Sequence, residues 1–111
     1  MIDLYYCPTP NCQKVSIALE ELGLPYQVHP IDIVGGDQNQ PSYTRICPNR
    51  KVPAIVDPDG PNGQELVLWE SAAILMYLAE KAGALWPTDP VQQALGRQWL
   101  FWQMSYVGPM M

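Results

Sequence analysis

The chain has 111 residues, of which 48% are hydrophobic and 15% charged, a composition that predicts one globular domain with its own core. Eleven acidic residues outnumber six basic ones, and no basic stripe is visible, so nucleic acids and anionic membranes are excluded as predicted partners. The stretch MIDLYY lacks the features of a signal peptide, and no apolar run approaches the ~18 residues of a membrane span. Three cysteines, an odd number, argue against a secreted disulfide framework and predict a reducing cytoplasm.

The first third of the chain predicts a strand, a helix and a second strand. Residues 2–6 are largely apolar or aromatic, as in a short buried strand. Asn11 is the expected N-cap of a helix over residues 12–22. That helix has four apolar residues at helical spacing, namely Val15, Ala18, Leu19 and Leu22. Residues 26–32 predict the second strand, which Pro30 confines to a sheet edge or a strand end.

The remaining elements complete a small α/β pattern. After a polar loop, residues 42–46 predict one helical turn, and a Pro/Gly turn joins strands at 53–57 and 64–69 into a hairpin. A helix follows over residues 71–82, and a last helix begins after Asp89, the expected N-cap. The order β-α-β-(α)-β-β-α predicts a small mixed sheet with helices on its faces.

The C-terminal tail has an unusual composition. Its last fourteen residues, QWLFWQMSYVGPMM, include nine apolar side chains. A monomer that ends there is expected to expose a large apolar patch, and such patches mark an interface or a missing partner. We therefore expect that the chain is truncated or self-associates. The alternative is that the tail folds back on its own sheet.

Three sequence motifs carry a family resemblance. Thr-Pro-Asn at 9–11, PNRKVPAI at 48–55 and WESAAI at 69–74 together resemble the N-terminal domain of a cytosolic glutathione transferase. More narrowly, the chain resembles the bacterial nu-class transferases and their yeast prion-protein relatives, which act as glutathione-dependent disulfide reductases. The resemblance implies a thioredoxin-like βαβ-α-ββα four-stranded mixed sheet over residues 1–86. It also implies that residues 87–111 are a linker and the first helix of an all-α domain.

Candidate glutathione-binding residues lie in three places. A Val-Pro pair before a strand suits a cis-proline, although a trans turn proline is the commoner interpretation from sequence alone. The family implies that Pro53 is cis, that Val52 pairs with the cysteinyl part of glutathione and that Gln38 contacts the peptide. Ser71 and the helix N-terminus can hold a carboxylate, and Glu70 an ammonium, the two groups of the γ-glutamyl end. The alternative is that Ser71 only caps its helix.

The stretch CPTPNC predicts the thiol chemistry. Thr9 stands where glutaredoxins carry the attacking cysteine of C-P-x-C, and Cys12 stands at the second cysteine. Bound glutathione is therefore expected to supply the nucleophilic sulfur, with Thr9 and Asn11 as hydrogen-bond donors and catalytic residues. A hydrogen bond to a charged group contributes ~1.5–3 kcal/mol, and one pKa unit corresponds to ~1.4 kcal/mol. One or two donors can thus bring a thiol pKa near 8.5 into the neutral range.

The cysteines leave alternatives open. Cys12 can resolve a mixed disulfide, but a buried filler thiol is the favoured interpretation. Cys7 is expected to pack in the core, and Cys47 to be a small cap substitute. One histidine and scattered cysteines support no metal site.

The leading hypothesis is a glutathione-dependent enzyme of the transferase family. It reduces disulfides or conjugates small electrophiles, needs no metal and is expected in the cytoplasm as a homodimer or self-associated chain. One alternative is a glutathione-binding or regulatory dimerisation module without catalysis. A third and weakest hypothesis is a two-cysteine redox protein using Cys7 and Cys12.

Overall fold

The computed structural model describes residues 1–110 and contains the predicted order of elements. Its β-strands are β1 (Ile2–Tyr6), β2 (Tyr26–Pro30), β3 (Ala54–Asp57) and β4 (Leu66–Trp69). Its α-helices of four residues or more are α1 (Pro10–Leu22), α2 (Pro41–Thr44), α3 (Ser71–Ala82) and α4 (Pro90–Trp102). Short helical segments are η1 (Asp37–Asn39), η2 (Pro61–Gly63), the π-helical η3 (Gln103–Val107) and α5 (Gly108–Met110).

The four strands form one mixed sheet in the order β2-β1-β3-β4. β1 runs parallel to β2 and antiparallel to β3, and β3 and β4 form the predicted hairpin. β2 lies at an edge, as its terminal Pro30 predicted, because proline has no N–H to donate to a further strand. The thioredoxin-like fold is therefore confirmed.

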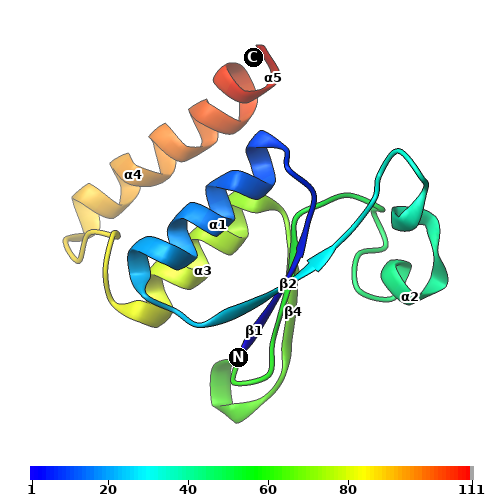
Figure 1. Ribbon diagram of the computed structural model, residues 1–111. Coiled ribbons are helices and arrows are strands. Elements are labelled where there is room, and N and C mark those ends of the chain that lie inside the picture. The colour runs from blue at the N-terminus through cyan, green and yellow to red at the C-terminus, as the bar shows by residue number, and fades with distance from the viewer. Residues whose placement is uncertain (111) are drawn as a thin grey trace.

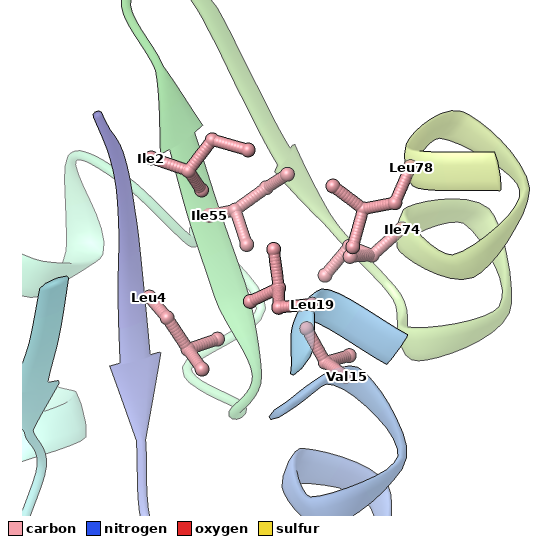
Figure 2. Close-up of a cluster of buried hydrophobic side chains, with 7 residues drawn as sticks. All are labelled: Ile2, Leu4, Val15, Leu19, Ile55, Ile74 and Leu78. Carbon is pink, nitrogen blue, oxygen red and sulfur yellow. The ribbon is translucent and has the colours of Figure 1, made fainter. Parts of the chain in front are cut away.

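Helices α1 and α3 cover one face of the sheet, and α2 lies beyond the other face (Figure 1). The core fills the space between the sheet and helices α1 and α3 (Figure 2). It contains Ile2, Leu4, Val15, Leu19, Ile55, Ile74 and Leu78, each at most 3% exposed. The helical spacing at residues 12–22 thus predicted the buried face of α1 correctly.

The start of α1 differs from the prediction. The N-cap is Thr9, whose hydroxyl oxygen accepts a hydrogen bond from the Cys12 N–H at 3.4 Å, and the cap is not Asn11. The reason is Pro10, whose fixed φ and missing N–H suit the first helical position, so the helix begins before Asn11. At the other end, Gly23 adopts the left-handed conformation that closes a helix, with φ 67°.

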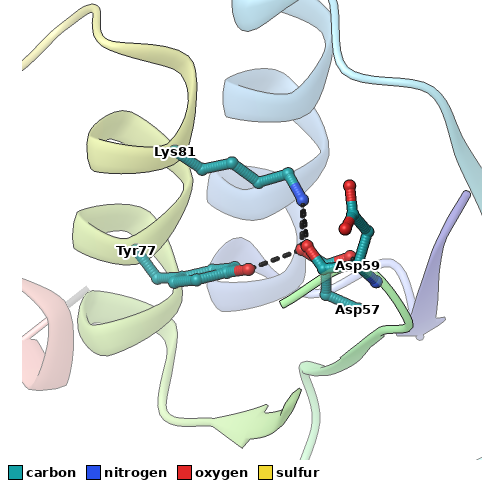
Figure 3. Close-up of polar contacts among 4 residues, drawn as sticks. All are labelled: Asp57, Asp59, Tyr77 and Lys81. Carbon is teal, nitrogen blue, oxygen red and sulfur yellow. Dashed lines mark hydrogen bonds and ion pairs between the residues drawn. The ribbon is translucent and has the colours of Figure 1, made fainter. Parts of the chain in front are cut away.

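A polar network ties β3 to the C-terminal half of α3 (Figure 3). Asp57 is only 2% exposed, and its Oδ2 accepts hydrogen bonds from Tyr77 Oη at 2.5 Å and Lys81 Nζ at 2.7 Å. Lys81 also donates to the Asp59 carbonyl oxygen at 2.8 Å. These contacts fix the C-terminal half of α3 on the sheet, and the rigid helix thereby fixes the position of its N-terminus relative to the strands.

Helix α4 forms an outer layer beside α1 and α3, and it leads the chain back toward the start of α1 (Figure 1). An apolar groove lies between these helices, with Leu22, Leu75 and Trp99 among its lining side chains. Within residues 1–110, no helix combines the length and the apolar character that a membrane span requires.

Candidate functional site

A small cavity lies where the start of α1, the loop before β3 and the start of α3 meet, and we call it the site cavity. It is lined by Asn11, Cys47, Lys51, Val52, Pro53, Trp69, Glu70, Ser71 and Met104. These residues come from five separate parts of the sequence, and the sheet brings them together. The Val52–Pro53 peptide bond is cis, as the resemblance implied.

Five of the seven residues that were predicted as catalytic or glutathione-binding line this cavity, namely Asn11, Val52, Pro53, Glu70 and Ser71, whereas the possible redox residue Cys12 does not. Thr9 and Gln38 are not among its lining residues. Thr9 is half-buried at the N-cap of α1, two residues before Asn11. Gln38 lies in η1, where its side-chain N–H donates to the Ile33 carbonyl oxygen at 3.1 Å. The binding role of Gln38 stays a prediction.

The N-terminus of α3 forms one wall of the site cavity. Glu70 occupies the N-cap position with φ 80° and ψ 115°, a backbone conformation unusual for a residue with a side chain. Ser71 is the first helical residue and is 3% exposed, so it does not cap the helix as the alternative interpretation supposed. Its hydroxyl donates to the sulfur of Met104 at 3.7 Å. The unpaired N–H groups and the dipole of α3 favour an anion at this end.

The N-terminus of α1 supplies polar groups on the other side. The Thr9 hydroxyl oxygen accepts the capping bond, which leaves its O–H able to donate to a ligand. Asn11 is exposed, and its Oδ1 accepts a hydrogen bond from Lys14 Nζ at 2.8 Å. Burial lowers the pKa of Lys14. This end of α1 therefore combines a hydroxyl, an amide and an ammonium group.

Four residues that line the site cavity were not predicted as site residues, namely Cys47, Lys51, Trp69 and Met104, and neither was their neighbour Lys14. Lys14 follows Asn11 by three positions, so helical spacing alone could have indicated the contact. Lys51 precedes the Val-Pro pair and lines the cavity. Met104 lies far along the sequence in η3, and no sequence signal predicts where that segment packs. π-Helical turns of this kind occur frequently at functional sites.

All three cysteines are free thiols. Cys12 and Cys47 are fully buried, and Cys7 is half-buried. Burial raises the pKa of Tyr43, and the nearby thiols of Cys47 and Cys12 raise it further. Cys47 lines the site cavity and belongs to the buried cluster around Tyr43. It is not a cap of α2, whose N-cap is Gln40 and whose C-cap is Arg45, so the predicted cap role is wrong and the thiol is a buried packing residue.

Comparison with known proteins gives a consistent result. Residues 8–81 match the family "Glutathione S-transferase, N-terminal domain". The chain is 48% identical over 112 residues to Disulfide-bond oxidoreductase YfcG of Escherichia coli, with 100% of this chain and 52% of that protein covered. It is 38% identical over 107 residues to Protein URE2 of Debaryomyces hansenii, with 91% and 34% covered.

A solved structure shows the same likeness in three dimensions. The crystal structure of a glutathione transferase from Pseudomonas putida, with one glutathione disulfide bound per subunit, has a TM-score of 0.95 and 51% identity to this chain. The match covers 98% of this chain and 47% of that one. The chain thus spans about half the length of YfcG and of the Pseudomonas putida transferase, and about a third of the URE2 protein. From its sequence, its fold and these likenesses, the chain belongs to the glutathione S-transferase family, and it contains the thioredoxin-like N-terminal domain of that family.

Proposed function

We propose that the chain binds glutathione in the site cavity and stabilises its thiolate for the reduction of disulfides. The observation that carries the proposal is the convergence of Asn11, the Val52–Pro53 pair and Ser71 on one cavity. The cavity joins an anion-favouring helix N-terminus to a turn with hydrogen-bond donors. These are the groups that a peptide with a carboxylate at one end and a thiol in its middle requires.

The proposed binding mode assigns one part of the ligand to each wall. The γ-glutamyl carboxylate lies at the N-terminus of α3 and accepts a bond from Ser71, in place of the present Ser71–Met104 contact. Glu70 pairs with the ammonium group on the same carbon. The backbone of Val52 pairs with the cysteinyl residue, which brings the sulfur toward Thr9 and Asn11.

The reaction requires no thiol of the protein. The glutathione thiolate attacks one sulfur of a disulfide, so a new S–S bond forms while the old one breaks. The departing thiolate takes a proton from solvent. A second glutathione thiolate then attacks the mixed disulfide and yields glutathione disulfide and the second free thiol. Disulfide reduction is preferred to conjugation of electrophiles because the relative YfcG is a disulfide-bond oxidoreductase.

The remaining expectations belong to the same proposal. Residues 1–86 form the glutathione-binding domain, and residues 87–111 are a linker and the first helix of an all-α domain. The reducing cytoplasm is the proposed compartment, since the three free thiols persist there. A homodimer or self-associated chain is the proposed assembly.

The test is the ultraviolet titration of bound glutathione, together with turnover of hydroxyethyl disulfide. Thr9→Ala and Asn11→Ala should each raise the thiol pKa by about one to two units, because a hydrogen bond to a charged group contributes ~1.5–3 kcal/mol. A Cys7→Ser/Cys12→Ala variant should keep its turnover. An unchanged thiol pKa in both single variants contradicts the proposed mechanism, and loss of turnover in the cysteine variant favours the two-cysteine alternative.

A further inference from the structure

Lys14 lies one turn after Asn11 on α1, and its ammonium group contacts three acceptors. These are Asn11 Oδ1 at 2.8 Å, Gln103 Oε1 at 3.0 Å and the sulfur of Met104 at 3.5 Å. A lysine ammonium has three N–H donors and no acceptor. Each donor therefore has a partner, and the side chain has a fixed position.

This arrangement determines the orientation of the Asn11 amide. Because Lys14 can only donate, the atom of Asn11 that faces it is the oxygen, and the NH₂ group stays available for another partner. The last torsion of an asparagine side chain is broad and roughly two-fold, so the amide can exchange its oxygen and nitrogen at little cost. Without Lys14, Asn11 can present its oxygen to a thiolate, and two electron-rich atoms then face each other.

Asn11 also lies between two adjoining cavities. It lines the site cavity with Ser71, and it lines a second cavity together with Lys14 and Met104. An amide held by its oxygen at this point can serve as a donor on the side of the glutathione site.

We propose that Lys14 is a positioning residue that fixes the Asn11 amide with its NH₂ group available to the glutathione sulfur. The inference rests on the proposed function, since it concerns the same thiol. The contacts of Lys14 with Gln103 and Met104 also connect the start of α1 to η3. A lysine on a helix surface that faces only water needs no protein acceptor for its three N–H groups, whereas Lys14 has one for each.

The experiment uses the 111-residue chain with the substitutions Lys14→Met and Lys14→Arg. Titration of bound glutathione should show a thiol pKa about one unit higher in Lys14→Met, which is about tenfold less thiolate at a fixed pH well below both pKa values. Lys14→Arg retains the donors and should restore most of the shift. Gln13→Met, an exposed neighbour on α1, is the matched control and should leave the pKa unchanged.

A double variant separates positioning from a direct charge effect. In the Asn11→Ala background, Lys14→Met should have no further effect on the thiol pKa, because the group that Lys14 orients is absent. An equal effect in both backgrounds overturns the proposal and makes Lys14 a direct electrostatic partner of the sulfur. An unchanged pKa in the single Lys14→Met variant also overturns it.

A readout without glutathione distinguishes this inference from the proposed function. The side-chain amide resonances of Asn11 in the free protein should move in Lys14→Met and stay in place in Gln13→Met. If the chain binds no glutathione, the proposed function fails while these resonances still decide the orientation of Asn11. Resonances that are identical in Lys14→Met and the wild type overturn the positioning role.

Discussion

Glu70 combines an exposed side chain with a backbone conformation that few residues adopt. Its φ of 80° lies in the region that glycine tolerates, and its side chain makes no capping bond to α3. Such a conformation costs about 1–3 kcal/mol and occurs mainly at functional sites. We infer that a glutamate is kept at this position because its side chain faces the proposed glutathione ligand.

Replacing Glu70 separates stability from binding. Glu70→Gly should raise the free energy of unfolding by up to about 1 kcal/mol, because glycine relieves the strain but loses more backbone entropy on folding. The same variant should weaken glutathione binding, since it lacks the partner of the ammonium group. Urea unfolding and calorimetry measure the two effects.

The control for this prediction is Asn62→Gly, at another position of positive φ (60°) outside the site cavity. It should leave glutathione affinity unchanged and add less stability, because asparagine tolerates this conformation better than glutamate. The affinity loss of Glu70→Gly should disappear with a peptide that lacks the γ-glutamyl group. Equal affinities of wild type and Glu70→Gly for glutathione contradict the assignment.

Single residues show where sequence reasoning reached its limit. Ser71 was found because a strand-to-helix junction with a hydroxyl is visible in the sequence. Thr9 was predicted as a site residue but not as the cap, because Pro10 takes the first helical position and moves the helix start ahead of Asn11. Met104 was not predictable, because its contact with Ser71 depends on how η3 packs over the site.

Among the elements, the link between β3 and α3 has the clearest energetic consequence. Burial alone raises the pKa of Asp57, but the hydrogen bonds from Lys81, Tyr77 and the Asp59 N–H, with the charge of Lys81, lower it below its ordinary value overall. The folded state therefore holds Asp57 ionised at a pH where the unfolded chain binds a proton. The resulting stability is present above about pH 4 and is lost as the pH falls through the folded pKa.

Tyr77→Phe tests this network. It removes the donor at 2.5 Å from Asp57, so the free energy of unfolding should fall by about 1.5–3 kcal/mol at neutral pH. The acid unfolding midpoint should also rise, because the pKa of Asp57 is then lowered less. Urea unfolding at a series of pH values measures both changes.

Tyr26→Phe is the matched control for this substitution. The Tyr26 hydroxyl donates to Glu20 at 2.9 Å, but that bond is exposed to water. Its loss should therefore change the stability by less than about 0.5 kcal/mol. If the two variants are equally stable, the buried network contributes no more than a surface contact.

For the whole molecule, the sequence predicted the sheet and its two covering helices well, because each element has its own periodicity and its own end signals. Pro30 at the sheet edge and the core residue Leu19 are examples. The position of α4 could not be predicted in the same way. Its apolar side chains do not lie on one narrow stripe. The sequence therefore could not decide whether they pack on the sheet of the same chain or against another protein.

The structure shows that much of this apolar surface is uncovered. Trp99, Phe101, Trp102 and Tyr106 are 59%, 61%, 48% and 67% exposed. Trp99 also lines the groove beside α1 and α3, whereas Phe101 and Trp102 are not among the residues that line that groove or the site cavity. Full burial of a large apolar side chain stabilises by roughly 1.5–3 kcal/mol, so this surface favours association.

We predict that the 111-residue chain self-associates through Phe101 and Trp102. The double substitution Phe101→Glu/Trp102→Glu should give a monomer, because two charges cannot be buried against a second copy without partners. Light scattering and sedimentation over a range of concentrations measure the change, and the glutathione thiol pKa should stay the same. The control is Val34→Glu, at a loop residue that is 96% exposed, and it should associate like the wild type. A wild-type chain that stays monomeric at high concentration contradicts the prediction, because the exposed aromatic side chains of α4 then do not drive association.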